Sequence, residues 1–224
     1  MDTNFVITIG RQLGSGGREI GNLLAERMNV PFYDKELIAL ASKQSGLSKD
    51  VFEKADEKTK FSLSGGFWGL KSSIFDEGFT NSYLCNETLF KIQSDVIREL
   101  AEKSSCVFVG RCADYILRDH SCAVHVFVSA DLPDRIKRVV DYHQFSEEKA
   151  LDFIEKTDKK RAGYYNFYSN KQWGAASSYH LCINSSVQGV EATVDVIQQF
   201  LERKRQSSIN PYVGCKRADN TAEQ

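Results

Sequence analysis

The residues best suited to chemistry lie in a glycine-rich segment near the N-terminus, which reads IGRQLGSGGRE over residues 9–19. The segment follows an apolar run and opens a stretch with helical periodicity. In that arrangement backbone N–H groups converge on a phosphate, and the helix N-terminus adds partial positive charge. We therefore predict a phosphate-binding loop, against the alternative of a plain strand-to-helix turn. Its candidate phosphate ligands are Arg11, Gly14, Ser15, Gly16, Gly17 and Arg18.

The loop departs from the P-loop pattern G-x-x-x-x-G-K-[ST] at three positions. With Gly16 as the second glycine, Arg11 takes the place of the first glycine. Gly17 then stands where the lysine belongs, and Arg18 stands where the Mg²⁺-binding hydroxyl belongs. The lysine normally bridges the terminal phosphates, and a guanidinium binds phosphate well without being equivalent to an ammonium. Arg11 and Arg18 are both candidates to supply the missing charge.

Other charged residues follow predicted strands or lie on predicted helices. Arg111 comes directly after an apolar run, and α/β proteins bind ligands at the carboxyl ends of their strands. The alternative for Arg111 is an ordinary surface arginine. Arg135 and Arg138 are three residues apart and therefore share a helix face. That face either lies at the ligand-binding edge of the sheet or is exposed to solvent.

A second cationic region, residues 156–173, is dense in Lys, Arg and Tyr. Arg161 is its candidate functional arginine. Tyr165 belongs to a group of aromatic residues spaced three to four positions apart. Such residues either stack on a base or pack the segment against the core, and the spacing favours packing.

The elements that must position these residues alternate along the chain. Five short apolar runs predict strands buried on both faces of a parallel sheet. Segments between and after them have helical periodicity, which predicts right-handed crossovers in an α/β fold. The predicted strands cover residues 5–9, 30–33, 106–109, 123–128 and 181–183. The predicted helices cover 18–28 and 88–103, start near 132 and 147, and include 190–201.

Composition excludes several classes of protein. The 224 residues carry 29 basic and 30 acidic side chains, so the chain lacks the basic surplus of proteins that coat nucleic acid or anionic membranes. No apolar run reaches the ~18 residues of a membrane span. The N-terminus lacks the features of a signal peptide, and the six cysteines contain no CxxC pair. We expect a cytoplasmic protein with reduced thiols and no metal site built from His or Cys.

Several motifs together resemble the cytidylate kinase-like family, relatives of the P-loop nucleoside monophosphate kinases with an altered phosphate loop. The N-terminal motifs are ITIGRQLGSGGREIG at 7–21 and PFYDKELI at 31–38. The later motifs are VFVGRCADYIL at 107–117, RAGYYNFY at 161–168, WG at 173–174 and YHLCINSS at 179–186. The resemblance covers nearly the whole chain, except residues from about 55 to 85 and the tail.

The resemblance implies a three-layer P-loop NTPase fold, with a five-stranded parallel sheet and helices on both faces. Residues 1–34 and 88–205 would form the kinase core, with a lid at about 156–173. Residues 35–87 would form a helical insert that binds the nucleoside monophosphate, and 206–224 a flexible tail. A homodimer is compatible with this organisation.

The resemblance also implies a reaction, the transfer of the γ-phosphoryl group of ATP, with Mg²⁺, to CMP or dCMP. Arg18, Arg111 and Arg161 would be catalytic. Arg111 would hold the acceptor phosphate, and Arg161 would bridge at the transition state. Asp34 would be an acceptor-site or metal-associated carboxylate, with a helix cap as the alternative. Arg135, if its helix begins at the ligand-binding edge, and Tyr165, if it stacks on the base, are further candidates for the acceptor site. Two alternatives stay open: a nucleotide- or anion-binding regulatory protein, and a kinase for another small metabolite, because residues 35–40 differ from the usual acceptor segment.

Overall fold

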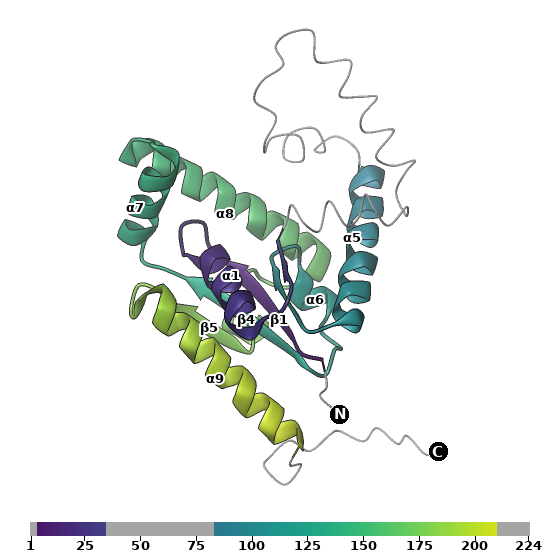
Figure 1. The fold of residues 1–224 in the computed structure, drawn as a ribbon. Coiled ribbons are helices and arrows are strands. Elements are labelled where there is room, and N and C mark those ends of the chain that lie inside the picture. Colours follow the sequence, from purple (N-terminus) through teal and green to yellow (C-terminus); the bar gives the residue numbers. More distant parts are fainter. Residues whose placement is uncertain (1–3, 35–82, 210–224) are drawn as a thin grey trace.

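The computed structural model describes residues 4–34 and 83–209. Within them, five strands form one sheet in which every pairing is parallel, in the order β2-β3-β1-β4-β5 (Figure 1). Strand β1 is central, and Ile9 pairs with Val109 of β3 and Val126 of β4. The carboxyl end of β1 therefore opens between those of its two neighbours. The strands are β1 Val6–Arg11, β2 Phe32–Tyr33, β3 Cys106–Val109, β4 Ala123–Ser129 and β5 Leu181–Asn184.

Helices cover both faces of the sheet (Figure 1). Helices α1 and α9 pack on one face, whereas α5, α6 and part of α8 pack on the other. This is the three-layer α/β architecture that the sequence predicted, and the prediction of the fold class is confirmed. The helices are α1 Gly17–Met28, α5 Tyr83–Lys103, α6 Ala113–Ile116, α7 Leu132–His143, α8 Glu147–Ser169 and α9 Gly189–Ile209, with a 3₁₀ turn η1 at Ala176–Ser178.

The core is divided by the sheet, because successive side chains of a strand point to opposite faces. Ile7 and Ile9 of β1 lie in the cluster beneath α1 and α9. Val6 lies in the cluster beneath α5 and α6, together with Phe108 of β3. All four side chains are almost fully buried. Two-sided burial explains why the strands read as continuous apolar runs rather than as alternating patterns.

Helices α7 and α8 form a separate pair at the carboxyl edge of the sheet, as Figure 1 shows. They pack through Val139, Ala150 and Ile154. The hydroxyl of Ser146 caps α8 by accepting a hydrogen bond from the Lys149 N–H. The helix then runs unbroken to Ser169, so the predicted lid segment begins inside a 23-residue helix.

Some boundaries differ from the predictions. Helix α5 begins at Tyr83, five residues before the predicted start, and α9 continues to Ile209, past the predicted end of the core at 205. Most of the predicted insert at 35–87, and most of the predicted tail, lie outside the described residues. No helix in the described part of the chain combines the length and apolar character needed to cross a membrane.

Candidate functional site

The glycine-rich segment connects the carboxyl end of β1 to the start of α1, as predicted (Figure 1). Gly14 has φ 77°, a left-handed conformation that favours glycine. A Cβ added there would also lie 2.7 Å from the carbonyl oxygen of Arg135. Gly16 is the N-cap residue of α1, also left-handed with φ 75°. The loop therefore offers N–H groups of the first turn of α1 to an anion, and the Gly17 N–H also makes a long bond of 3.4 Å to Ser15 Oγ.

Helix α7 holds the carbonyl groups of this loop. Arg135 Nε donates to the Leu13 carbonyl at 2.7 Å, and Arg138 Nη1 donates to the Gly14 carbonyl at 3.1 Å. The Asp158 carboxylate accepts from the Leu13 N–H at 2.8 Å and also pairs with Arg135 Nη2. Arg135 is only 7% exposed, so the solvated-face interpretation is wrong for it. Its Nε holds the loop and its Nη2 pairs with Asp158, whereas its position near the start of a helix predicted a place in the acceptor site.

Ser15 also supports the loop from inside. Its buried hydroxyl donates to the Gln12 carbonyl at 2.9 Å. Its own carbonyl accepts from the Ser185 hydroxyl at 2.7 Å. The Gln12 side chain in turn accepts from the Ala130 N–H at 3.3 Å. These bonds join the loop to the ends of β4 and β5. Gln12 and Ser185 were missed as site residues, because short polar residues after strands carry no distinctive pattern.

Arg11, the last residue of β1, carries its guanidinium into a group of charges at the carboxyl edge. Burial lowers the pKa of Arg11 to about 9, and the positive charges of Arg161 and Arg111 act in the same direction. Asp34 and Asp158 oppose the shift with smaller effects. Arg161 Nη1 donates to the Arg11 carbonyl at 3.2 Å. The fold thus brings together three of the predicted arginines from β1, the β3–α6 turn and α8.

Arg111 lies in a turn with an unusual backbone. Gly110, Arg111 and Cys112 have φ values of 84°, 57° and 55°, so three successive residues are left-handed. Non-glycine residues adopt this conformation at a cost, and such residues concentrate at functional sites. Arg111 Nε is buried without a hydrogen-bond partner among the described residues. Since a buried unpaired donor is unfavourable, this geometry suits an anionic ligand.

Arg18 pairs with Asp34, which directly follows β2 and whose charge also acts on Arg11. Its Nη2 and Nε lie 2.7 and 2.9 Å from Asp34 Oδ2. The Asp34 side chain is 7% exposed, whereas that of Arg18 is 68% exposed. The guanidinium also lies 5.9 Å from the ring centroid of Phe32. Two predicted site residues therefore contact each other.

Tyr165 lies in the core cluster beneath α5 and α6. Its hydroxyl donates to Asp114 Oδ2 at 2.8 Å, and its ring stacks 6.2 Å from that of Tyr179. Burial raises the pKa of Asp114, although this hydrogen bond acts in the opposite direction. The described geometry agrees with the packing interpretation of Tyr165 and gives its hydroxyl a structural partner in place of a base.

A magnesium ion held by protein ligands does not fit the described residues. Position 18 carries a guanidinium where the P-loop pattern has a hydroxyl, and that guanidinium already pairs with Asp34. Asp158 is engaged by Leu13 and by Arg135. No group of three His, Cys, Asp or Glu side chains gathers within residues 4–34 and 83–209. Within those residues, a magnesium ion accompanying a nucleotide would be held mainly by phosphate oxygens and water, because this ion keeps several waters and binds substrate phosphates.

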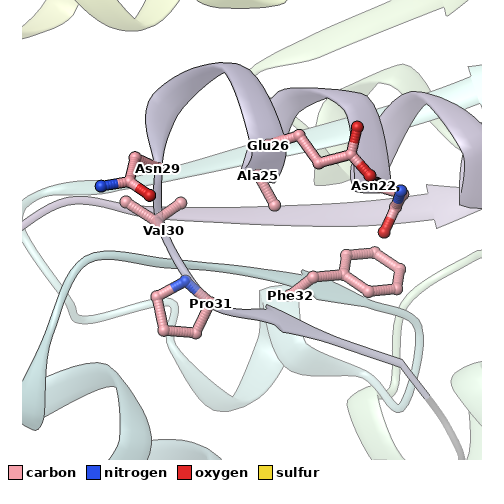
Figure 2. Close-up of a pocket in the computed structure, with 7 residues that line it drawn as sticks. All are labelled: Asn22, Ala25, Glu26, Asn29, Val30, Pro31 and Phe32. Atoms are coloured by element: carbon pink, nitrogen blue, oxygen red, sulfur yellow. Dashed lines mark hydrogen bonds between the residues drawn. The ribbon is translucent and has the colours of Figure 1, made fainter.

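A cavity of about 350 Å³ lies beside the second half of α1, whereas the glycine loop precedes the first turn of that helix. Figure 2 shows the side chains that line the cavity. The cavity is formed by the second half of α1 and the turn into β2. None of the predicted site residues lines it, so it is separate from the arginine group. Its lining residues are Asn22, Ala25, Glu26, Asn29, Val30, Pro31 and Phe32.

Comparison with known proteins identifies relatives of this fold and loop. The profile of the cytidylate kinase-like family matches residues 6–187. A cytidylate kinase from Methanosphaera stadtmanae is 24% identical over 206 residues, which cover 89% of this chain and 99% of that protein.

Solved structures show the same architecture. An uncharacterized protein from Eubacterium ventriosum superposes with a TM-score of 0.66 at 30% identity, covering 89% of this chain and 99% of that one. A shikimate kinase from Bacteroides thetaiotaomicron superposes with a TM-score of 0.50 at 17% identity, covering 88% and 98%. The second likeness concerns the fold alone.

Proposed function

The chain belongs to the cytidylate kinase-like family, and from this premise we propose that it transfers the γ-phosphoryl group of ATP to a nucleoside monophosphate. The observation that carries the proposal is the convergence of Arg11, Arg111 and Arg161 beside the glycine loop. Phosphoryl transfer requires two phosphorylated substrates in line and cations around the transferring group. The glycine loop can hold the phosphates of one substrate, and the guanidinium groups beside it can bind the other substrate and surround the transferring group.

The donor occupies the glycine loop in this proposal. Backbone N–H groups of residues 14–18 surround the β- and γ-phosphates, and the N-terminus of α1 adds partial positive charge. The carbonyl groups of Leu13 and Gly14 are held against α7 by Arg135 and Arg138. The loop is thereby preorganised, with no carbonyl reorientation needed when the nucleotide arrives.

The acceptor phosphate binds Arg111, whose buried Nε has no partner among the described residues. An oxygen of that phosphate attacks the γ-phosphorus, a new P–O bond forms, and the bond to the β-phosphate oxygen breaks to release ADP. Arg161 bridges the two phosphates and stabilises the charge that develops on the transferring group. No protein nucleophile is needed.

CMP and dCMP are the first acceptors to test, because the relative from Methanosphaera stadtmanae is a cytidylate kinase. The segment at 35–40 that would contact the acceptor base lies outside the described residues. The acceptor panel should therefore contain all common nucleoside monophosphates.

The experiment measures ADP production from ATP and Mg²⁺ with each acceptor in turn. We expect turnover with one acceptor, and loss of that turnover in the Arg111→Ala variant. Arg98→Ala is the matched control, because Arg98 is an exposed arginine of α5 that pairs with Asp95 on its own helix. No turnover with any nucleotide, together with intact ATP binding, would instead favour the regulatory-protein alternative or a different metabolite as acceptor.

A further inference from the structure

We propose that Arg11 supplies the positive charge that a P-loop lysine would provide. This inference rests on the proposed function, in which the triphosphate of ATP is the anion at the glycine loop. The two departures from the P-loop pattern at positions 11 and 17 are then one compensated exchange. Compared with the P-loop pattern, the cationic residue stands at the end of β1, at position 11, instead of at the start of α1. The glycine stands at position 17 instead of at position 11.

Steric contact between the two positions supports the exchange. A Cβ added at Gly17 would lie 2.5 Å from the Cβ of Arg11 and 3.0 Å from its Cγ. Carbon atoms do not approach so closely, because the repulsion rises steeply below van der Waals contact. A lysine at position 17 and the observed Arg11 side chain therefore exclude each other. Glycine at 17 is the residue that lets the arginine pass beneath the start of α1.

The guanidinium end of the Arg11 side chain packs against a second glycine, Gly110. A Cβ added at Gly110 would overlap Arg11 Nη1 and lie 3.0 Å from its guanidinium carbon. Gly110 also has φ 84°, which favours glycine in its own right. The Arg11 side chain thus runs between Gly17 and Gly110. Its guanidinium ends at the edge where Arg111 and Arg161 converge.

Arg18, the other candidate for the missing charge, is placed differently. Both Nε and Nη2 of Arg18 contact Asp34, and the side chain is 68% exposed. Its charge is therefore neutralised by a buried carboxylate at the end of β2. The Arg11 guanidinium instead lies beside Arg111 and Arg161. Burial first, and then these two positive charges, lower its pKa against the opposing effect of Asp34 and Asp158, and a bound anion would favour its charged form.

An exchange cycle tests the proposal by measuring ATP affinity calorimetrically, with thermal unfolding as a check on folding. The variants are Arg11→Gln, Arg11→Gly, Gly17→Lys and the double variant Arg11→Gly/Gly17→Lys. We expect Arg11→Gln and Arg11→Gly to weaken ATP binding about tenfold or more, because a charge-assisted contact is lost. Gly17→Lys alone should lower the melting temperature, because the new side chain meets Arg11.

Recovery in the double variant is the diagnostic result. Removing the Arg11 side chain opens the space for a lysine in the conventional P-loop position, so ATP affinity should return to within about threefold of wild type. A purely structural role of Arg11 would not produce that recovery. Arg18→Ala should cost less ATP affinity than Arg11→Gln. Arg98→Gln is the control for removing an exposed arginine, since Arg98 lies on α5.

Three outcomes separate this proposal from the proposed function. Unchanged ATP affinity in Arg11→Gln, or no recovery in a folded double variant, would overturn the exchange even if the wild type phosphorylates a nucleotide. If the ATP affinities of the variants follow the expected pattern but no acceptor is phosphorylated, the result would support the exchange of Arg11 for the lysine and contradict the proposed kinase function. A wild-type chain that binds no ATP would overturn both.

Discussion

The Asp158 carboxylate accepts a hydrogen bond from the backbone N–H of Leu13 at 2.8 Å. This bond joins α8 to the glycine loop across 145 positions of sequence. The same carboxylate pairs with Arg135, which itself holds the Leu13 carbonyl. One acidic side chain therefore links α7, α8 and the loop, and the shape of the loop depends on the position of both helices.

Removing this carboxylate should destabilise the protein and weaken the loop. We expect Asp158→Ala to lower the free energy of unfolding by about 2–3 kcal/mol, because the Leu13 N–H and the buried Arg135 guanidinium lose their acceptor. ATP affinity should fall as well. Denaturant unfolding and calorimetry measure the two effects. Asp152→Ala is the matched control on the same helix: its exposed pair with Lys156 should contribute less than about 1 kcal/mol. Equal effects of the two variants would contradict the role of Asp158.

The hydroxyl of Tyr165 should matter for stability rather than for substrate. We expect Tyr165→Phe to lower the free energy of unfolding by about 1–2 kcal/mol, because the buried Asp114 loses a donor. The KM for the acceptor should not change. Tyr142→Phe is the comparison at an 83% exposed tyrosine, where no effect is expected. A raised acceptor KM in Tyr165→Phe at unchanged stability would restore the base-contact hypothesis.

ATP affinity should fall as the pH rises through about 9, the value to which burial and like charges lower the pKa of Arg11. Bound phosphate favours the charged guanidinium, so ATP binding above that pH must take up a proton and becomes weaker. The phosphates of ATP are already fully ionised there. Calorimetry between about pH 7 and pH 10 measures the slope, since an ordinary Arg stays charged over that range.

Arg11→Gln is the control for this titration, because glutamine carries no proton that titrates in this range. Its ATP affinity should be lower and nearly independent of pH. Parallel pH curves for wild type and variant would assign the titration to another group.

Acid should destabilise the protein through His125. Burial lowers the pKa of His125 to about 3, and the positive potential of His180 acts in the same direction. Its Nδ1 lies 2.9 Å from the Thr8 hydroxyl, inside the sheet. In the unfolded chain the imidazole takes up a proton near pH 6.5. The stabilising contribution of neutral His125 is therefore present at neutral pH and is lost as the pH falls from about 6.5 toward 3.

Melting temperatures across this pH range measure the effect. The stability advantage of wild type over His125→Gln should shrink as the pH falls, because glutamine does not titrate. A difference that is constant with pH would show that His125 keeps a more ordinary pKa in the folded protein.

The architecture and the location of the glycine-rich loop could be predicted from the amino-acid sequence alone. Apolar runs such as 106–109 are short and unbroken, and a strand buried on both faces is the structure that needs such a run. The glycine-rich segment lies between one such run and a helical pattern. The connection from a strand to the helix that follows it involves only neighbouring residues, so it can be predicted from the sequence. Periodicity also identified α7 and α9, since each carries its own apolar stripe.

The difference between Arg11 and Arg18 emerged only in the folded chain. Both flank the glycines, and nothing in their spacing indicates which guanidinium joins Arg111 and Arg161 and which one pairs with a carboxylate. Gly110, about a hundred positions away from Arg11, leaves the space that the Arg11 guanidinium occupies. Asp34 instead forms an ion pair with Arg18. Such contacts form when strands align side by side, and strand order is a property of the whole sheet. The same holds for Arg135 and Asp158: a charged residue on a helix looks solvent-exposed in sequence until the loop it supports packs against it.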